Sequence, residues 1–272
     1  MRKRFRVTPA SAVLLMYSAG ILLILLYISY NSLRVRGDFL RNTLGLPEVL
    51  TLQNYVTIFV RDHFITYIYS SVVILVATLM LNTMLASMVA YGIGRFKFRF
   101  HRPVLMYFLI GMMFPIQLSV VPLFLIMRDL GLLNTYLSVI LVSSASMSLP
   151  VLLLNIFFSK LPDDIYESAK LEGASEFRIF LQVMMPLASP VIVSIMIIIS
   201  LQVWNQFFLP LIFLQSDRIK TLPLAQLMYT VNMMRIDRAL AAATVSVVPV
   251  ITLYFIFSKR VISGVAEGAV KG

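Results

Sequence analysis

The chain has 272 residues, of which 60% are hydrophobic and 13% are charged, and its formal net charge is +11. This excludes a soluble globular protein, because soluble domains are only about half apolar. Its basic residues are scattered over short loops, so they indicate membrane topology and not nucleic-acid binding. The absence of cysteine excludes disulfides and thiolate metal sites.

The first predicted element is an uncharged run over residues 7–33, which follows four basic residues. About 20 residues at ~1.5 Å per residue cross a bilayer, and the run is longer than the apolar part of a signal peptide. We therefore expect a cytoplasmic N-terminus over residues 1–10 and an uncleaved first transmembrane span over residues 11–30. A polar extracytoplasmic loop over residues 31–63 follows.

Residues 64–258 are expected to hold five further spans. The second span ends at a turn that contains Arg95 and three more bases but no acid, which is typical of the cytoplasmic side. Six spans place both termini in the cytoplasm, with the tail at residues 259–272. The second to sixth spans are expected within residues 64–91, 103–127, 136–158, 188–209 and 239–258.

The apolar pattern breaks between the fourth and fifth spans, at residues 161–186, into a segment of mixed charge. Asp164 as N-cap with Glu167 three residues later matches a capping box. Gly173 can adopt a positive φ and turn the chain into a second helix. The segment is thus predicted to be a small cytoplasmic helix–turn–helix, with Ala169 near its centre, that docks into a groove of another protein. A simple hairpin that links two spans explains the same pattern.

The spacing in this segment resembles the EAA signature of ABC importer permease subunits, which reads E-A-A-x3-G-x9-I-x-L-P. Ser168 stands at an alanine position, and Val183 and Met185 replace the Ile and Leu of the signature. Other stretches of the chain are similar to the carbohydrate-importing branch, specifically to the maltose-type permease with six spans. Within the signature, Glu167, Ala169, Gly173 and Pro186 are identical to it, and Ser168, Val183 and Met185 are the three replacements.

The resemblance implies the type I importer permease fold: an all-α membrane protein with six transmembrane helices and a cytoplasmic coupling helix between spans four and five. The implied partners are a second homologous permease subunit, two ATP-binding subunits that hold ATP and Mg, and an extracytoplasmic solute-binding protein. That protein would meet the outer loops near Asn54 and at residues 215–238. The implied location is the cytoplasmic (inner) membrane of a bacterium or archaeon. The ATPase contacts would come from Asp164, Glu167, Ser168, Ala169 and Gly173.

The residues agree with such a role by elimination. The sequence contains no phosphate-binding loop of the G-x-x-x-x-G-K-[ST] type, so the chain is expected to be no enzyme and to bind no cofactor of its own. The predicted spans lack charged residues that could carry protons or a coupling ion. No catalytic constellation and no metal site are expected, since the serines of the spans have no His or acidic partner. Uphill transport would therefore need energy from another subunit.

Uncharged polar residues within the spans predict a pathway for a neutral solute, because amides bind sugar hydroxyls and an aromatic ring stacks on a sugar. The same amides could instead join helices, a role favoured for Asn82 and Asn155 and worth about 0.6 kcal/mol each. Trp204 could equally be an interfacial anchor. The candidates are Gln117, Gln202, Trp204, Asn205 and Gln206.

The sequence thus predicts a permease subunit that forms half of the pathway of an ATP-driven importer for a sugar or oligosaccharide. Two alternatives stay open. One is a permease for another solute class, such as amino acids or phosphate. The other is a passive channel or facilitator, in which the charged segment only links two spans.

Overall fold

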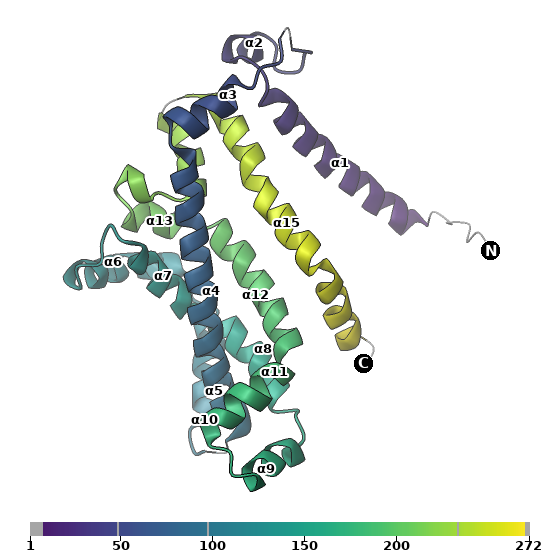
Figure 1. Cartoon of the computed structure of the whole chain (residues 1–272), viewed down its shortest axis with the longest axis vertical. Coiled ribbons are helices and arrows are strands. Elements are labelled where there is room, and N and C mark those ends of the chain that lie inside the picture. Colours follow the sequence, from purple (N-terminus) through teal and green to yellow (C-terminus); the bar gives the residue numbers. More distant parts are fainter. Residues whose placement is uncertain (1–7, 48, 97, 233, 270–272) are drawn as a thin grey trace. The chain divides into compact units, whose positions relative to one another are not determined.

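The computed structural model describes residues 8–47, 49–96, 98–232 and 234–269, which form helices joined by short connections (Figure 1). This part of the chain divides into two compact units. Unit 1 comprises the described residues of Met1–Ile65 together with Leu224–Ile251, and unit 2 comprises Thr66–Pro223 with the described residues of Thr252–Gly272. The first seven residues of the predicted N-terminus and the last three of the predicted tail lie outside the described residues.

Unit 1 begins with the apolar helix α1 (Pro9–Asn31). Thr8 caps it by accepting a hydrogen bond from the backbone N–H of Ser11 at 3.3 Å, and proline at the first helical position has no N–H to leave unpaired. The helix is long and apolar enough to cross a membrane, and none of the residues in its most apolar 18-residue stretch is buried. A helix that is hydrophobic on all sides and exposed within its own unit suits a lipid environment.

The loop after α1 folds around a buried arginine and contains the short helices α2 (Arg36–Arg41), α3 (Gln53–Val56) and η1 (Thr57–Arg61). Arg34 is fully buried and donates to both carboxylate oxygens of Asp38, at 2.9 and 2.8 Å. Asn54 donates from its amide to the backbone oxygens of Ser32 and Arg34, both at 2.8 Å. Asn54 is therefore buried in the loop. Its side chain is not available to a binding protein, and the prediction of such a contact applies only to the residues around it.

The rest of unit 1 comes from the C-terminal third of the chain. The helices α14 (Leu222–Leu227) and η5 (Met228–Asn232) together form an apolar stretch too short to span, and unit 1 takes α14 from Leu224 onward. The helix α15 (Ile236–Ala269), which belongs to unit 1 up to Ile251, covers the residues predicted as the sixth span. Arg238 binds both oxygens of Asp62 at 3.0 and 3.1 Å, so charge pairing joins this stretch to the end of the first loop.

Unit 2 is built on α4 (Phe64–Arg95), which packs with α8 (Ser148–Phe158) and α12 (Ser189–Trp204) around one apolar core. At Gly94, α4 and α8 approach each other closely. A Cβ atom there would lie 3.1 Å from the amide nitrogen of Asn155 and 3.2 Å from Cβ of Phe158, so a larger residue would push these helices apart.

Three of the predicted spans are bent helix pairs. The bends are 95° between α5 (His101–Gly111) and the following pair η2 (Ile116–Ser119) and α6 (Val120–Asp129), 44° between α7 (Tyr136–Ala145) and α8, and 77° before α12. The described residues thus contain two straight candidate spans, or up to five if each bent pair is one span, and the sixth stays a prediction. Apart from the two short helices of the mixed-charge segment, the remaining helices are η3 (Phe180–Met184), α11 (Met185–Leu187), α13 (Phe208–Phe213) and η4 (Asp217–Ile219).

The bend between α7 and α8 is supported by a side chain from α4. Asn82, which is buried, donates from its amide to the backbone oxygen of Ser144 at 2.9 Å and to that of Ser146 at 3.2 Å. A break in a membrane helix frees carbonyl groups that neighbouring helices must satisfy. Asn82 therefore joins helices, which is the role that the sequence favoured for it.

Candidate functional site

The mixed-charge segment begins with α9 (Asp163–Leu171), which lies at the end of unit 2 where α4 ends (Figure 1). Its N-cap is Pro162, and no side chain caps the helix. The prediction that Asp164 is the N-cap of a capping box with Glu167 is therefore wrong. The N-cap lies two residues earlier than predicted, so Asp163 and Asp164 occupy the first turn, where acids interact favourably with the helix dipole.

The predicted turn at Gly173 is confirmed. Gly173 has a φ of +81°, in the left-handed region that a residue with a side chain rarely adopts. The N–H of Gly173 bonds to the oxygen of Lys170 at 3.0 Å, and the N–H of Ala174 bonds to that of Ala169 at 3.2 Å. Ser175 then caps α10 (Glu176–Ile179), so the chain reverses between two short helices.

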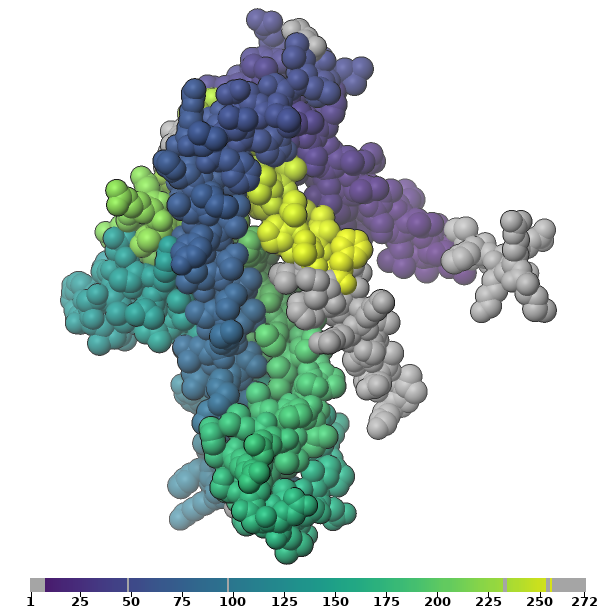
Figure 2. Space-filling view, in the orientation of Figure 1, coloured from purple at the N-terminus to yellow at the C-terminus, as the bar shows by residue number. Residues whose placement is uncertain are grey.

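Helix α9 has two faces. Ile165, Tyr166 and Ala169 are partly buried, and the last two pack against the core of unit 2. Asp164, Glu167 and Ser168 are exposed on the other side. Of the five predicted coupling residues, these three and Gly173 are thus accessible to a partner, whereas Ala169 contributes mainly to packing. Figure 2 shows this segment, in green, at the surface of its end of the unit.

An apolar residue that the sequence reasoning missed stands among these exposed acids. Leu171, the last residue of α9, is 89% exposed. A leucine so exposed next to a fixed turn is a natural anchor for an apolar pocket on another protein. Helical spacing could have indicated it, since Leu171 follows Glu167 and Ser168 by one turn on the outer face.

The packed face of α9 carries a charged network centred on Tyr166. Lys170 donates from Nζ to the hydroxyl of Tyr166 at 3.1 Å and to Oε1 of Glu176 at 3.0 Å, and the hydroxyl of Tyr166 donates to the same Oε1 at 2.6 Å. The pKa of Lys170 is raised to about 12, mainly by the hydrogen bond with Tyr166 and secondly by the hydrogen bond with Glu176. The hydrogen bonds from Tyr166 and Lys170 lower the pKa of Glu176.

A cavity of about 950 Å³ lies elsewhere in unit 2, between α5, η2, the α7–α8 bend and α12. None of the residues that line it is charged. Hydroxyl and amide groups that face aromatic rings can bind a neutral, hydroxylated solute. The polar and aromatic lining residues include Tyr107, Phe108, Ser119, Ser146, Ser148 and Gln202.

One of the five predicted pathway residues, Gln202, lines this cavity. Trp204 is buried, with 4% of its surface exposed, and Asn205 is exposed and donates its amide to the backbone oxygen of Leu201 at 2.8 Å. Gln206 is half-buried and Gln117 is exposed on η2, and neither is among the lining residues. The predicted cluster is therefore dispersed, because Gln202 and Trp204 face different directions on α12 and the helix ends before Asn205. The serines at the α7–α8 bend were missed, although the string SASMSLP indicates a break.

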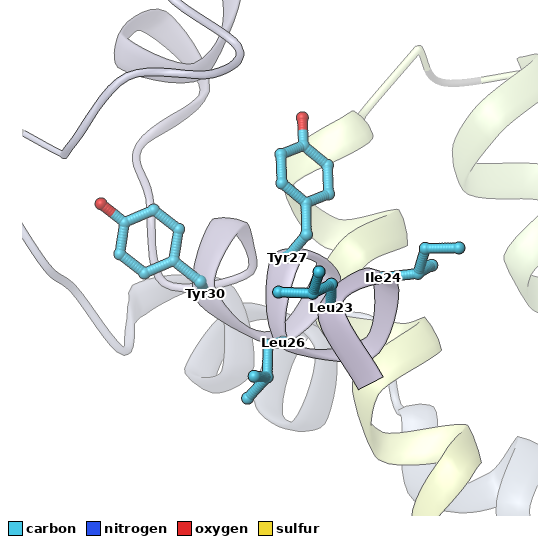
Figure 3. Close-up of a pocket in the computed structure, with 5 residues that line it drawn as sticks. All are labelled: Leu23, Ile24, Leu26, Tyr27 and Tyr30. Carbon is cyan, nitrogen blue, oxygen red and sulfur yellow. The ribbon is translucent and has the colours of Figure 1, made fainter. Parts of the chain in front are cut away.

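A second pocket lies along α1 in unit 1 and has a different character. Figure 3 shows its lining side chains, which project from one helix. Apart from two tyrosine hydroxyls the lining is hydrocarbon, so it offers little to a sugar and suits a lipid chain or an apolar helix face. The lining residues are Leu23, Ile24, Leu26, Tyr27 and Tyr30.

Comparison with known families and proteins agrees with these features. Residues 82–266 match the family described as binding-protein-dependent transport system inner membrane component. The chain is 34% identical over 262 residues to the diacetylchitobiose uptake system permease protein NgcG of Streptomyces coelicolor, covering 94% of this chain and 86% of that protein. It is 31% identical to the arabinooligosaccharides transport system permease protein AraQ of Halalkalibacterium halodurans, covering 91% and 90%. It is 32% identical to the trehalose transport system permease protein SugB of Mycobacterium tuberculosis, covering 84% of each.

The fold is also similar to a solved structure. A chain in the crystal structure of a bacterial ABC transporter involved in the import of the acidic polysaccharide alginate superimposes with a TM-score of 0.74. The two sequences are 20% identical, and the match covers 94% of this chain and 99% of the other. A second structure of the alginate transporter, in complex with a pentasaccharide-bound periplasmic protein, gives a TM-score of 0.66 at 17% identity, covering 92% and 94%.

Proposed function

Because the chain belongs to the family of inner membrane components of binding-protein-dependent transport systems, we propose that it imports a sugar or oligosaccharide as one of two permease subunits. In this proposal the chain forms half of the translocation pathway. Six spans leave both termini in the cytoplasm. A separate pair of subunits binds and hydrolyses ATP with Mg, and an extracytoplasmic protein delivers the solute.

The observation that carries the proposal is the two-faced helix α9. One face is fixed to the core of unit 2 and the other presents Asp164 and Glu167 to solvent, with Leu171 at its end. A linker would need no such division, whereas a docking helix needs one face for its own protein and one for its partner. The complementary surface on the ATPase would hold an apolar pocket for Leu171 and basic groups for the two acids.

The uncharged cavity supports a sugar as cargo. Its serines and Gln202 offer hydrogen bonds, and Tyr107 and Phe108 offer aromatic surface. Relatives named for the uptake of diacetylchitobiose, arabinooligosaccharides and trehalose favour the same class. An importer for amino acids or phosphate would need charged groups to pair with its cargo, and the lining of this cavity has none.

Competition for uptake tests the cargo class. Cells or vesicles with the complete transporter would be given a labelled neutral oligosaccharide together with an excess of unlabelled di- and oligosaccharides, amino acids or phosphate. We expect sugars to compete and the charged solutes to have no effect. Competition by amino acids or phosphate alone would contradict the sugar proposal and leave the importer proposal standing.

A further inference from the structure

The end of α4 is tied to α9 by Arg95. Its side chain is 11% exposed, and Nη1 forms an ion pair with Oδ1 of Asp163 at the start of α9. Its guanidinium carbon also lies 4.4 Å from the ring centroid of Tyr166. A guanidinium over an aromatic face gains about 0.5–2 kcal/mol, depending on how far water is excluded.

Tyr166 extends this contact to the second short helix. Its hydroxyl bonds to Glu176 of α10, and Lys170 bridges the same pair. Phe96, the residue after α4, packs edge-on against the ring of Tyr166, with 6.4 Å between centroids. One tyrosine thus contacts the end of α4, its own helix α9 and the start of α10.

These contacts centre on the ring of Tyr166, which is partly buried and packs against the core of unit 2, so they do not by themselves explain docking. They do fix the direction of α9 relative to α4. A planar guanidinium that is paired and stacked at once has few alternative orientations. A lysine at this position would keep the charge and lose the stacking.

We propose that Arg95 is a positioning residue that makes α4 and the α9–α10 pair move as one rigid body. The end of α4 then follows when a partner ATPase displaces α9. The proposal rests on the proposed function, since it names the connection by which movement of the docking helix reaches the span. The apolar packing of Ala169 holds α9 in place, while Arg95 sets its orientation.

The variant Arg95→Met keeps much of the length of the side chain and removes both the charge and the stacking. Arg99→Met is the matched control, because Arg99 is an exposed base of the same turn that lies over Phe100, at 5.7 Å. The readout is ATP hydrolysis by the reconstituted complex, with and without solute-loaded binding protein. We expect Arg95→Met to keep basal hydrolysis and lose stimulation roughly five-fold or more, the lower end of a typical coupling between two sites.

The partner residue provides a second test. In Tyr166→Leu the ring is lost, and in the double variant with Arg95→Met we expect no further loss of stimulation, since both changes break the same connection. Tyr166→Phe keeps the ring for Arg95 and should lose less than Tyr166→Leu. Independent, multiplying losses would overturn the proposal, as would full stimulation in Arg95→Met.

A distance measurement covers the case in which Arg95→Met fails to assemble. The chain has no cysteine, so spin labels can be placed at Met88→Cys on α4 and Glu172→Cys at the end of α9, both exposed positions. We expect one narrow distance that stays the same with and without ATP. A distance that changes with the nucleotide would refute the rigid connection. If instead the wild-type complex shows no ATP-dependent uptake, the proposed function fails and not this connection alone.

Discussion

The guanidinium of Arg95 lies over the ring of Tyr166, with 4.4 Å between Cζ and the ring centroid. The two residues belong to helices that are separated in the sequence by α5 to α8. Their contact gives α9 a fixed packed face, so the opposite face can present acids and Leu171 to a partner.

Gly173 tests the turn. Gly173→Ala is expected to cost roughly 1–2 kcal/mol, because a residue with a Cβ is disfavoured at a positive φ. Asn tolerates this conformation better, so Gly173→Asn should lose less. A Cβ at Gly173 would meet no atom within 4 Å, so the effect comes from the backbone and not from a clash. Transport-coupled ATP hydrolysis should fall in the order Gly, Asn, Ala.

Gly92 provides the control for that series. A Cβ at Gly92 also meets nothing within 4 Å, and this residue lies inside α4 with an ordinary φ. Gly92→Ala is therefore expected to keep activity unchanged. Equal activity of the Asn and Ala variants at position 173 would show that the positive φ is unimportant for coupling.

Leu171 tests the exposed face. Leu171→Ala should leave the fold intact, since the side chain is 89% exposed. It should weaken binding of the ATPase subunit by roughly tenfold or more, because burying a leucine contributes about 1.5–3 kcal/mol. Leu118→Ala is the control, at a residue 72% exposed on η2. The measurement is the affinity of each variant for the purified ATPase subunit. Equal affinities of Leu171→Ala and Leu118→Ala would show that Leu171 is not an anchor.

Gln202 and Trp204 are expected to differ in the kind of defect they cause. Gln202→Ala should raise the solute concentration needed for half-maximal uptake while the protein stays folded, since Gln202 lines the cavity. Trp204→Ala should instead lower stability by about 3–5 kcal/mol, because Trp204 is 4% exposed. Leu201→Ala, at an exposed neighbour that does not line the cavity, is the control. Uptake kinetics and thermal unfolding of each variant separate the two effects.

The network of Lys170 and Glu176 is expected to contribute equally to stability at every pH near neutrality. The pKa of Glu176 is lowered from its ordinary 4.5, so its contribution to stability is complete above that value and is lost as the pH falls through the lowered pKa. The pKa of Lys170 is raised from 10.5 to about 12, so its contribution is complete below 10.5 and is lost as the pH rises through about 12. Neither group changes charge in between.

The measurement is the unfolding temperature of the wild type and Glu176→Gln as a function of pH. The difference between them should be constant from about pH 6 to pH 9 and should disappear in acid, below the lowered pKa of Glu176. Glu172→Gln removes a carboxylate from the exposed end of α9 and serves as the control. A difference that varies within the neutral range would contradict the assignment of the network.

The amino-acid sequence was sufficient to predict the helical class, the position of the mixed-charge segment and the turn at Gly173. These follow from hydrophobic runs and from the conformational freedom of glycine, which are local properties. The bends could be predicted only in part. Pro115 marks the position of the break before η2, but the 95° angle at that break depends on tertiary packing. The contact of Arg95 with Tyr166 and the serines of the cavity also depend on packing between distant segments, which no local pattern contains.

The central claim is that this permease imports its solute only with energy from a separate ATPase. The most direct measurement is uptake of a labelled oligosaccharide into proteoliposomes that hold either this chain alone or the chain with its second permease, ATPase subunits and binding protein. We predict uptake against a gradient in the complete assembly with ATP, and none with the chain alone. Downhill flux through the chain alone, unchanged by ATP in the assembly, would contradict the account and identify a passive facilitator.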